Sequence, residues 1–246
     1  MEYHVSAIDE RPNDPTYDAS MAGITHPRMV SAVAEAVFAI GGERNPNPFK
    51  LSCFAPLIQN LNTYRGTPYD ILFDADPADD LRSVSYWQQV MFNAHQGTQT
   101  LPVIALQGGF NPLFWVASID NITNAIYFKI VNAGNTTQSL SLQVDTPFVS
   151  VNGTILEPPT AGDLNAFNYF NNKTAIVPKP IMGLQNITHG LNSSEGLTWT
   201  VPAYSVSVIQ FDLGHSTDKR GTAKRNHVLK PQSALISRQE ALLGML

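Results

Sequence analysis

The stretch from residue 113 to 131, LFWVASIDNITNAIYFKIV, decides the fold class of this 246-residue chain. It holds two short apolar runs, and a polar cluster with two asparagines separates them. The pattern recurs from residue 98 to 213, where Gly, Pro and Asn clusters divide the runs LPVIAL, SLSLQV, TAIVP, LTWTV and SVSVIQFDL. Short strands at this spacing are typical of a β-sandwich. We therefore predict an all-β sandwich over residues 98–213.

Residues 1–97 have a strand-helix-strand-helix pattern, which favours a piece of an α/β domain. Apolar residues at helical spacing predict a first helix with Thr25 as its N-cap, Pro27 in its first turn and Gly41-Gly42 at its end. The apolar run LSCFAPLI, residues 51–58, predicts a buried strand that ends at Pro56 or lies at a sheet edge.

A second helix is predicted from about Ser83 to Ala94, and Gly97 stops it. Its apolar stripe is expected to consist of Val84, Trp87, Val90 and Met91. Two further tryptophans, Trp115 and Trp199, lie in predicted strands, and we expect both in the core.

The last segment, residues 214–246, contains six of the fifteen Lys and Arg residues and little apolar periodicity before ALLGML. A disordered tail is the expected state. A mis-spliced gene would give the same composition, and a functional basic tail is a further alternative.

Composition limits which partners we expect for this chain and which role its cysteine can have. The net charge of −5 gives no reason to expect nucleic acid or an anionic membrane as a partner. No apolar run reaches the roughly eighteen residues of a membrane span. The single cysteine, Cys53, excludes an internal disulfide, and its apolar neighbours predict a buried structural thiol.

Six Asn-x-Ser/Thr sequons indicate a secreted, glycosylated module, because each would need an exposed loop. They lie at Asn121, Asn135, Asn152, Asn172, Asn186 and Asn192. The alternative is that Asn, Ser and Thr are merely common in turns. The N-terminus, MEYHVSAIDERPND, has no secretory signal, so we expect the chain to be the downstream part of a longer secreted protein.

No metal site or cofactor is expected. The acidic cluster of Asp74, Asp76, Asp79 and Asp80 lacks the central glycine of a calcium loop and is interpreted as a solvated loop. The six histidines show no paired ligand spacing for zinc.

Several segments together resemble the C-terminal half of α-L-arabinofuranosidases of glycoside hydrolase family 51, especially fungal ones. SAVAEAVFAIGGERN (31–45) resembles the helix after barrel strand seven, and FAPLIQNLN (54–62) with TPYDILFDA (67–75) resembles the strand-eight region. SVSYWQQVMFNAHQG (83–97) is similar to the closing helix of the barrel. NAFNYFNNKTAIVPK (165–179) and TVPAYSVSVIQFDL (200–213) resemble the end of the C-terminal sandwich.

The resemblance implies an α+β composite: a partial (β/α)8 barrel remnant followed by an all-β jelly-roll sandwich. Residues 1–97 would hold barrel strands seven and eight with their helices, residues 98–213 the sandwich, and residues 214–246 the tail. The implied activity is retaining removal of terminal α-L-arabinofuranosyl groups from hemicellulose or pectin side chains.

Retaining hydrolysis needs a nucleophilic carboxylate and a second carboxyl that acts as acid and then base. The resemblance places Glu2-Tyr3 at the family's nucleophile motif, with Met1 where the family often has Gly. The family's acid/base Glu follows an Asn, and this chain has no Asn-Glu dipeptide and no room upstream for strands one to six. The other interpretation of Glu2 is a solvated terminal residue.

Substrate contacts are expected from Tyr3 and from the segment after strand eight, through Gln59, Asn60, Asn62 and Tyr64. Tyr64 and Gly66 stand where fungal relatives often carry Trp. The default interpretation of Gln59, Asn60 and Asn62 is that they are polar residues of a surface loop.

The first hypothesis is therefore the C-terminal portion of a secreted arabinofuranosidase that is inactive alone and acts on arabinose-containing polysaccharide or oligosaccharide. Unpaired barrel edges would favour self-association. The second is a non-catalytic secreted sandwich that binds polysaccharide or stabilises a partner. A truncated gene with no function of its own is the third.

Overall fold

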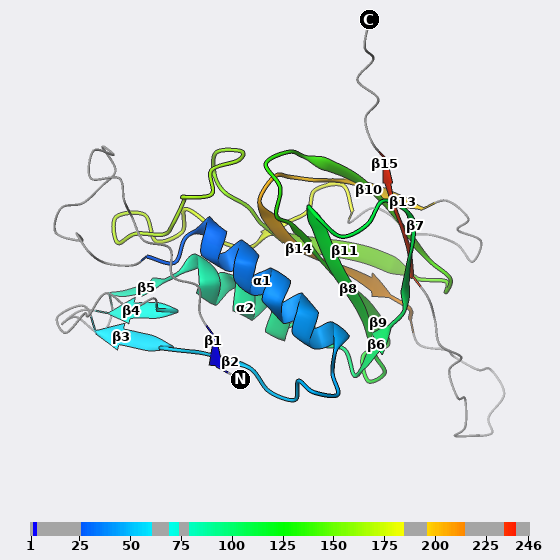
Figure 1. Cartoon of the computed structure of the whole chain (residues 1–246), viewed down its shortest axis with the longest axis horizontal. Coiled ribbons are helices and arrows are strands. Elements are labelled where there is room, and N and C mark those ends of the chain that lie inside the picture. Colours follow the sequence, from blue (N-terminus) through cyan, green and yellow to red (C-terminus); the bar gives the residue numbers. More distant parts are fainter. Residues whose placement is uncertain are drawn as a thin grey trace, which may run out of the picture.

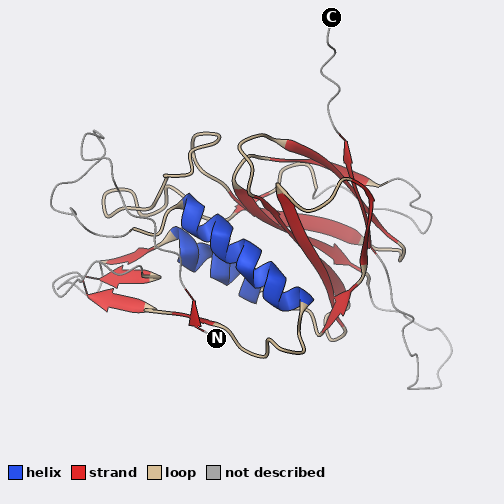
Figure 2. Cartoon of the chain, viewed as in Figure 1, coloured by secondary structure: helices blue, strands red, loops and turns tan. Residues whose placement is uncertain are grey.

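The computed structural model describes residues 2–3, 26–60, 69–73, 79–184, 196–214 and 234–239. Two helices lie side by side across one face of a six-stranded sheet, and a four-stranded sheet covers its other face (Figure 1). Strand dominates this part of the chain (Figure 2). The predicted β-sandwich is therefore confirmed.

The six-stranded sheet is antiparallel throughout, and the four-stranded sheet contains one parallel pair, β15 (Ala234–Gln239) with β7 (Val103–Gln107). The larger sheet has the order β12 (Lys179–Pro180), β11 (Ser150–Leu156), β14 (Ser205–Asp212), β9 (Ala125–Asn132), β8 (Leu113–Asp120) and β6 (Gln99–Leu101). The smaller sheet has the order β13 (Leu197–Val201), β10 (Gln138–Val144), β15 (Ala234–Gln239) and β7 (Val103–Gln107).

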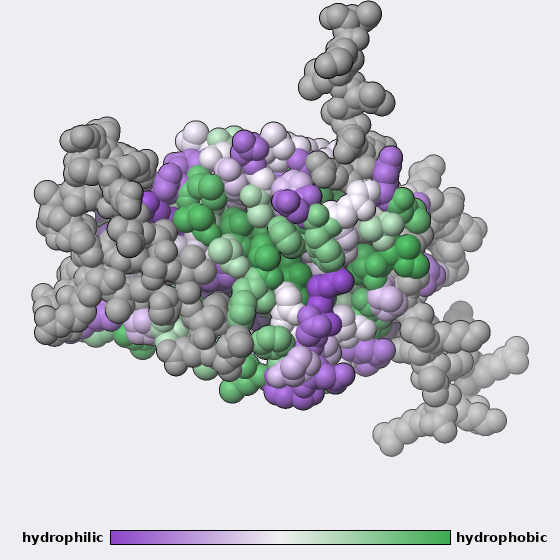
Figure 3. Space-filling model, viewed as in Figure 1, coloured by the Kyte–Doolittle hydropathy of each residue, from purple (hydrophilic) through white to green (hydrophobic). Residues whose placement is uncertain are grey.

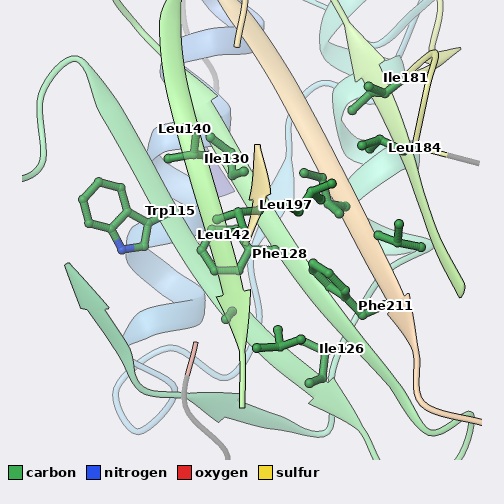
Figure 4. Packing of buried hydrophobic residues seen from close by; sticks show 14 of the residues in the cluster. Trp115, Ile126, Phe128, Ile130, Leu140, Leu142, Ile181, Leu184, Leu197 and Phe211 are labelled. Atoms are coloured by element: carbon green, nitrogen blue, oxygen red, sulfur yellow. The ribbon is translucent and has the colours of Figure 1, made fainter. Parts of the chain in front are cut away.

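The main core lies between these two sheets. Phe128 of β9, Phe211 of β14 and Leu142 of β10 are at most 2% exposed and belong to one apolar cluster (Figure 4). Trp115 is 5% exposed in the same cluster, as predicted, whereas Trp199 is only partly buried against it. Alternate residues along each strand supply this core, which is the period of a pleated strand.

A second core joins the larger sheet to α1 (Met29–Arg44) and α2 (Val84–Asn93). The side chains of Val116, Val131 and Val208 project from the outer face of the sheet toward the helices. They pack with residues of α1 (Ala32, Ala36 and Ile40) and of α2 (Met91 and Phe92). All eight residues of β9 are buried because both faces of the strand are covered. The segments on either side of residue 97 thus share one core.

The first helix differs from the prediction at both ends. Arg28 is its N-cap, so the helix begins after Pro27, and Thr25 lies outside the described residues. Gly41-Gly42 does not end it, because the helix continues to Arg44. Arg44 Nη1 donates to the Trp115 carbonyl at 3.2 Å, a tertiary contact that anchors the last turn against the sheet.

The second helix has the predicted limits, and its buried face matches the predicted stripe at Val84 and Met91 but not at Val90. Ser83 is the N-cap, and its Oγ accepts a hydrogen bond from the Tyr86 N–H at 3.1 Å. Gln88 is 1% exposed, whereas Val90, predicted in the apolar stripe, is 38% exposed. The stripe was wrong here because α2 packs against α1 and the sheet at once, which turns Gln88 inward.

The run at residues 51–58 is not one buried strand. It divides at the cis Ala55-Pro56 bond into β2 (Cys53–Phe54) and the start of β3 (Ile58–Asn60). Leu51 and Ile58 are 74% and 58% exposed, and Cys53 is exposed. The predictions of one buried strand and of a buried thiol were both wrong, whereas β2 does end just before Pro56, as predicted. Among the described residues, β2 pairs only with β1 (Glu2–Tyr3), and β3 only with β4 (Ile71–Phe73), which also pairs with β5 (Asp80–Arg82).

Three further differences concern the sandwich. The run TAIVP forms turns and loop instead of a strand. Strand β11, which carries Gly153, was missed. An added Cβ at Gly153 would lie 2.8 Å from Ile181 Cδ1 and from Leu184 Cδ1. Glycine therefore allows the segment that carries Ile181 and Leu184 to pack directly on β11. The expectation of a disordered tail is wrong for Ala234–Gln239, which forms β15.

Candidate functional site

The segment with the expected nucleophile counterpart is a short parallel strand pair. Glu2 pairs with Cys53 and Tyr3 with Phe54, so the carboxyl ends of β1 and β2 lie at the same edge. In α/β folds this edge carries ligands and catalytic groups. The pairing therefore aligns Glu2-Tyr3 with the segment that leads to Gln59 and Asn60.

The expected substrate-contact residues are only partly brought together. Gln59 and Asn60 lie on β3, in register with Leu72 and Phe73 of β4, and both are half-buried. This strand belongs to a different sheet from β1 and β2. Asn62 and Tyr64 lie outside the described residues.

A buried polar cluster lies at the start of β4. Tyr69 is 1% exposed, and its hydroxyl lies 2.8 Å from Nδ1 of His26, whose ring stacks on Phe167 at 4.8 Å. The next residue, Asp70, is also 1% exposed, and Nε2 of Gln89 donates to its two carboxylate oxygens at 3.0 and 2.8 Å. Burial raises the pKa of Asp70 to about 7, and the Gln89 hydrogen bond acts in the opposite direction.

A cleft of about 650 Å³ opens between the C-terminal halves of both helices, residues 46–52 and the larger sheet. At the sheet side, Lys129 Nζ lies 2.6 Å from Glu43 Oε2, and Ser118 Oγ donates to Glu43 Oε1 at 2.7 Å. The Lys129 side chain is only 3% exposed, and its ammonium lies 5.0 Å from the centre of the Phe92 ring.

The remaining walls of the cleft include several amide and aromatic side chains. Gln88, Gln89 and Asn93 come from α2, Gln96 from the segment that follows it, and Phe49 from the loop after α1. Oε1 of Gln88 is buried and has no hydrogen-bond partner among the described residues. Such walls can hydrogen-bond hydroxyl groups and pack against an apolar face.

Sequence reasoning missed this cleft. A single lysine inside the apolar run AIYFKIV was the available signal, because a lysine in a buried strand needs a partner. Its partner, Glu43, could not be identified because the first helix was expected to end before it.

The acidic cluster forms no metal site among the residues described. Asp79 pairs with Lys173, and Asp80 pairs with Arg82 at 3.0 Å. Asp74 and Asp76 lie outside the described residues. Within the described ranges, no three His, Cys, Asp or Glu side chains gather as metal ligands. Neither described helix has the length and apolar character to cross a membrane.

Four of the six sequon asparagines are described, and all four are exposed: Asn121, Asn135, Asn152 and Asn172. Nδ2 of Asn121 donates to Thr98 Oγ1 at 3.0 Å, so its amide is held at the surface. Asn186 and Asn192 lie outside the described residues. Glycosylation at these sites stays a prediction.

Comparison with known proteins gives one consistent family. The family model "Alpha-L-arabinofuranosidase C-terminal domain" matches residues 3–205. A probable alpha-L-arabinofuranosidase A of Aspergillus niger is 33% identical over 186 residues, which are 76% of this chain and 27% of the relative. One from Aspergillus oryzae is 32% identical over 188 residues, with 74% and 27% covered. The chain thus spans about a quarter of the length of these curated relatives.

Solved structures agree with this family. An arabinose-bound α-L-arabinofuranosidase of glycoside hydrolase family 51 superposes with a TM-score of 0.64 at 27% identity, over 87% of this chain and 32% of the other. The thermostable enzyme of that family from Thermotoga petrophila RKU-1 gives a TM-score of 0.57 at 14% identity, over 75% and 38%, which shows likeness of fold alone.

Proposed function

The chain belongs to the family of α-L-arabinofuranosidase C-terminal domains, and on that premise we propose that it is the C-terminal portion of a retaining α-L-arabinofuranosidase. Such an enzyme would remove terminal α-L-arabinofuranosyl groups from hemicellulose or pectin side chains. The observation that carries the proposal is the family match, which spans both helices and most of the sandwich.

The catalytic role proposed for this portion is to supply the nucleophile, Glu2, from the partial barrel. Its strand runs parallel to β2, which supports a place at the carboxyl edge where barrel enzymes carry their catalytic groups. A retaining mechanism needs the second carboxyl about 5 Å away. Because the chain lacks the Asn-Glu dipeptide, we propose that the acid/base comes from a part of the enzyme outside this chain.

We expect the purified chain alone to release no 4-nitrophenol from 4-nitrophenyl α-L-arabinofuranoside, because one carboxylate cannot perform both steps. In a complementation experiment, the N-terminal portion of a related enzyme is added to the chain. Activity recovered in this mixture should be lost when the chain carries Glu2→Gln. The matched control is Glu157→Gln, a half-buried carboxylate directly after the end of β11. Turnover by the chain alone that disappears with Glu2→Gln would contradict the proposal.

Secretion and N-glycosylation are part of the same proposal. The exposure of all four described sequon asparagines supports them, since an occupied sequon must reach solvent. Self-association through barrel edges is supported by the exposed apolar side chains of Leu51, Leu57 and Ile58 beside the short strands β2 and β3.

The second candidate function is a non-catalytic module that binds polysaccharide, and the amide-lined cleft beside Glu43 favours it. In that case the chain should be retarded in affinity electrophoresis on arabinoxylan without releasing sugar. Asn93→Ala in the cleft wall should abolish the retardation, and Asn135→Ala, exposed elsewhere, should leave it unchanged. Migration unaffected by arabinoxylan would exclude this function.

A further inference from the structure

Strand β15 occupies an internal position in the smaller sheet although it comes from the tail of the chain. It pairs antiparallel with β10 from Ser139↔Gln239 to Val144↔Ala234, and parallel with β7 on its other side. Neighbouring strands lie about 4.8 Å apart, so without β15 two unpaired edges would face each other across a gap one strand wide. The gap is a groove that an extended segment fits.

The groove belongs to the family domain, but the strand in it does not. The family match ends at residue 205 and contains β7, β10 and β13, whereas β15 begins at Ala234. Residues 215–233 separate β15 from the end of the sandwich at residue 214. The domain therefore offers a strand position that none of the described strands within the match fills.

The surfaces around the groove are apolar. Leu140 and Leu142 of β10 are 1% and 2% exposed and face the inter-sheet core, so loss of the neighbouring strand would open that core. On the other side, Ile104 and Leu106 of β7 are 52% and 62% exposed, and Figure 3 shows a green, apolar area over β7. Backbone groups on both edges and apolar side chains beside them are the features that bind an added strand.

The strand that fills the groove matches one of its two edges less well than the other. The sequence ALISRQ contains Ala, Ser, Arg and Gln, and only one β-branched residue, so its strand propensity is modest. Its register with β7 is irregular between Ile236 and Ser237. At position 238, an arginine is in register with Leu140 of the core. β15 thus pairs regularly with β10 but irregularly with β7, and its sequence adds little strand propensity to hold it there.

We propose that the groove between β10 and β7 is a strand-acceptor site, and that Ala234–Gln239 is a complementing strand that an identical segment from a second copy of the chain can replace. The pairing is set by backbone hydrogen bonds, so the incoming segment takes the same register. This inference does not depend on the proposed enzymatic function, because it concerns the sandwich alone.

The test uses the full chain and a fluorescent peptide of residues 231–242, PQSALISRQEAL, which stands for the segment of a second copy. The wild-type chain is expected to take up the peptide in a saturable way, measured by fluorescence anisotropy. The variant Ile236→Pro cannot donate its ladder hydrogen bond, so its own strand competes less and it should bind the peptide at least tenfold more tightly. Its melting temperature should fall by about 5 °C.

Two controls make the result specific. The chain with Val228→Pro, a substitution outside the strand, should bind like the wild type, and a peptide with proline at position 236 should not bind. Hydrogen exchange of the wild-type chain gives a second measurement that needs no variant: peptide in excess should leave the amides of residues 139–144 protected while the chain's own 234–239 amides exchange faster. Absence of saturable uptake by both chains, or equal uptake of the proline peptide, would overturn the proposal.

Discussion

The variant Glu43→Gln is expected to lower the free energy of unfolding by about 3 kcal/mol, since it leaves a buried ammonium without its counter-charge. Lys129 emerges from the fully buried strand β9 on the helix side, and its side chain is 3% exposed. Glu43 accepts from both Lys129 and Ser118, and glutamine keeps an acceptor but removes the charge. Equilibrium urea unfolding measures the loss as a lower midpoint at unchanged slope.

The chain contains a matched exposed pair for comparison. Asp80 and Arg82 form an ion pair at 3.0 Å with side chains 38% and 48% exposed, so Asp80→Asn should change stability by less than about 1 kcal/mol. The double variant Glu43→Gln/Lys129→Met should recover much of the loss, because it removes the unpaired charge as well. Equal midpoints for Glu43→Gln and the wild type would show that the pair contributes nothing.

The second large effect is a dependence of stability on pH that arises from Asp70. Its pKa is about 7 in the folded protein because of burial, against an ordinary value of 3.8. Between these two values the folded state binds more protons than the unfolded state, so stability falls as the pH rises from about 4 to about 7 and then levels off. The cost of ionising the buried carboxylate is at most about 4 kcal/mol above pH 7.

The variant Asp70→Asn should therefore be more stable than the wild type at pH 8 and similar to it at pH 4.5, because the amide stays neutral at both. Asp120→Asn is the matched control: hydrogen bonds from the Thr123 hydroxyl and the Ile122 N–H lower the pKa of Asp120, so its contribution is lost only in acid. Urea midpoints at pH 4.5, 6 and 8 give the comparison. A wild-type midpoint that rises steadily across this range, unaltered by Asp70→Asn, would contradict the assignment.

The sandwich was predictable because its signals are local. Short runs such as AIYFKIV and SVSVIQFDL, bounded by turn residues, lie within the observed strands β9 and β14, apart from the last residue of the second run. The limits of α2 were predictable for the same reason, since Ser83 and Gly97 act within a few residues of the helix ends. The family resemblance rested on the order of such segments, and the family match confirms it.

The predictions failed where contacts between residues far apart in the sequence decide the local structure. The first helix passes through Gly41-Gly42 because its end is held on the sheet through Arg44 and the Trp115 carbonyl. The run at residues 51–58 is apolar enough for a core, yet no described layer covers Leu51 and Ile58, which are exposed. Local composition does not specify which layer will cover a strand.

By itself, the sequence determined the limits of α2, most strands of the sandwich half, though not β11, and the family to which the chain is similar, because periodicity, caps and turn residues act over a few positions. Tertiary structure alone decided the partner of Lys129, the protonation of Asp70 and the insertion of the tail strand between β10 and β7. Each of these depends on burial and pairing between residues tens of positions apart, whose free energy is set only when the layers have closed on one another.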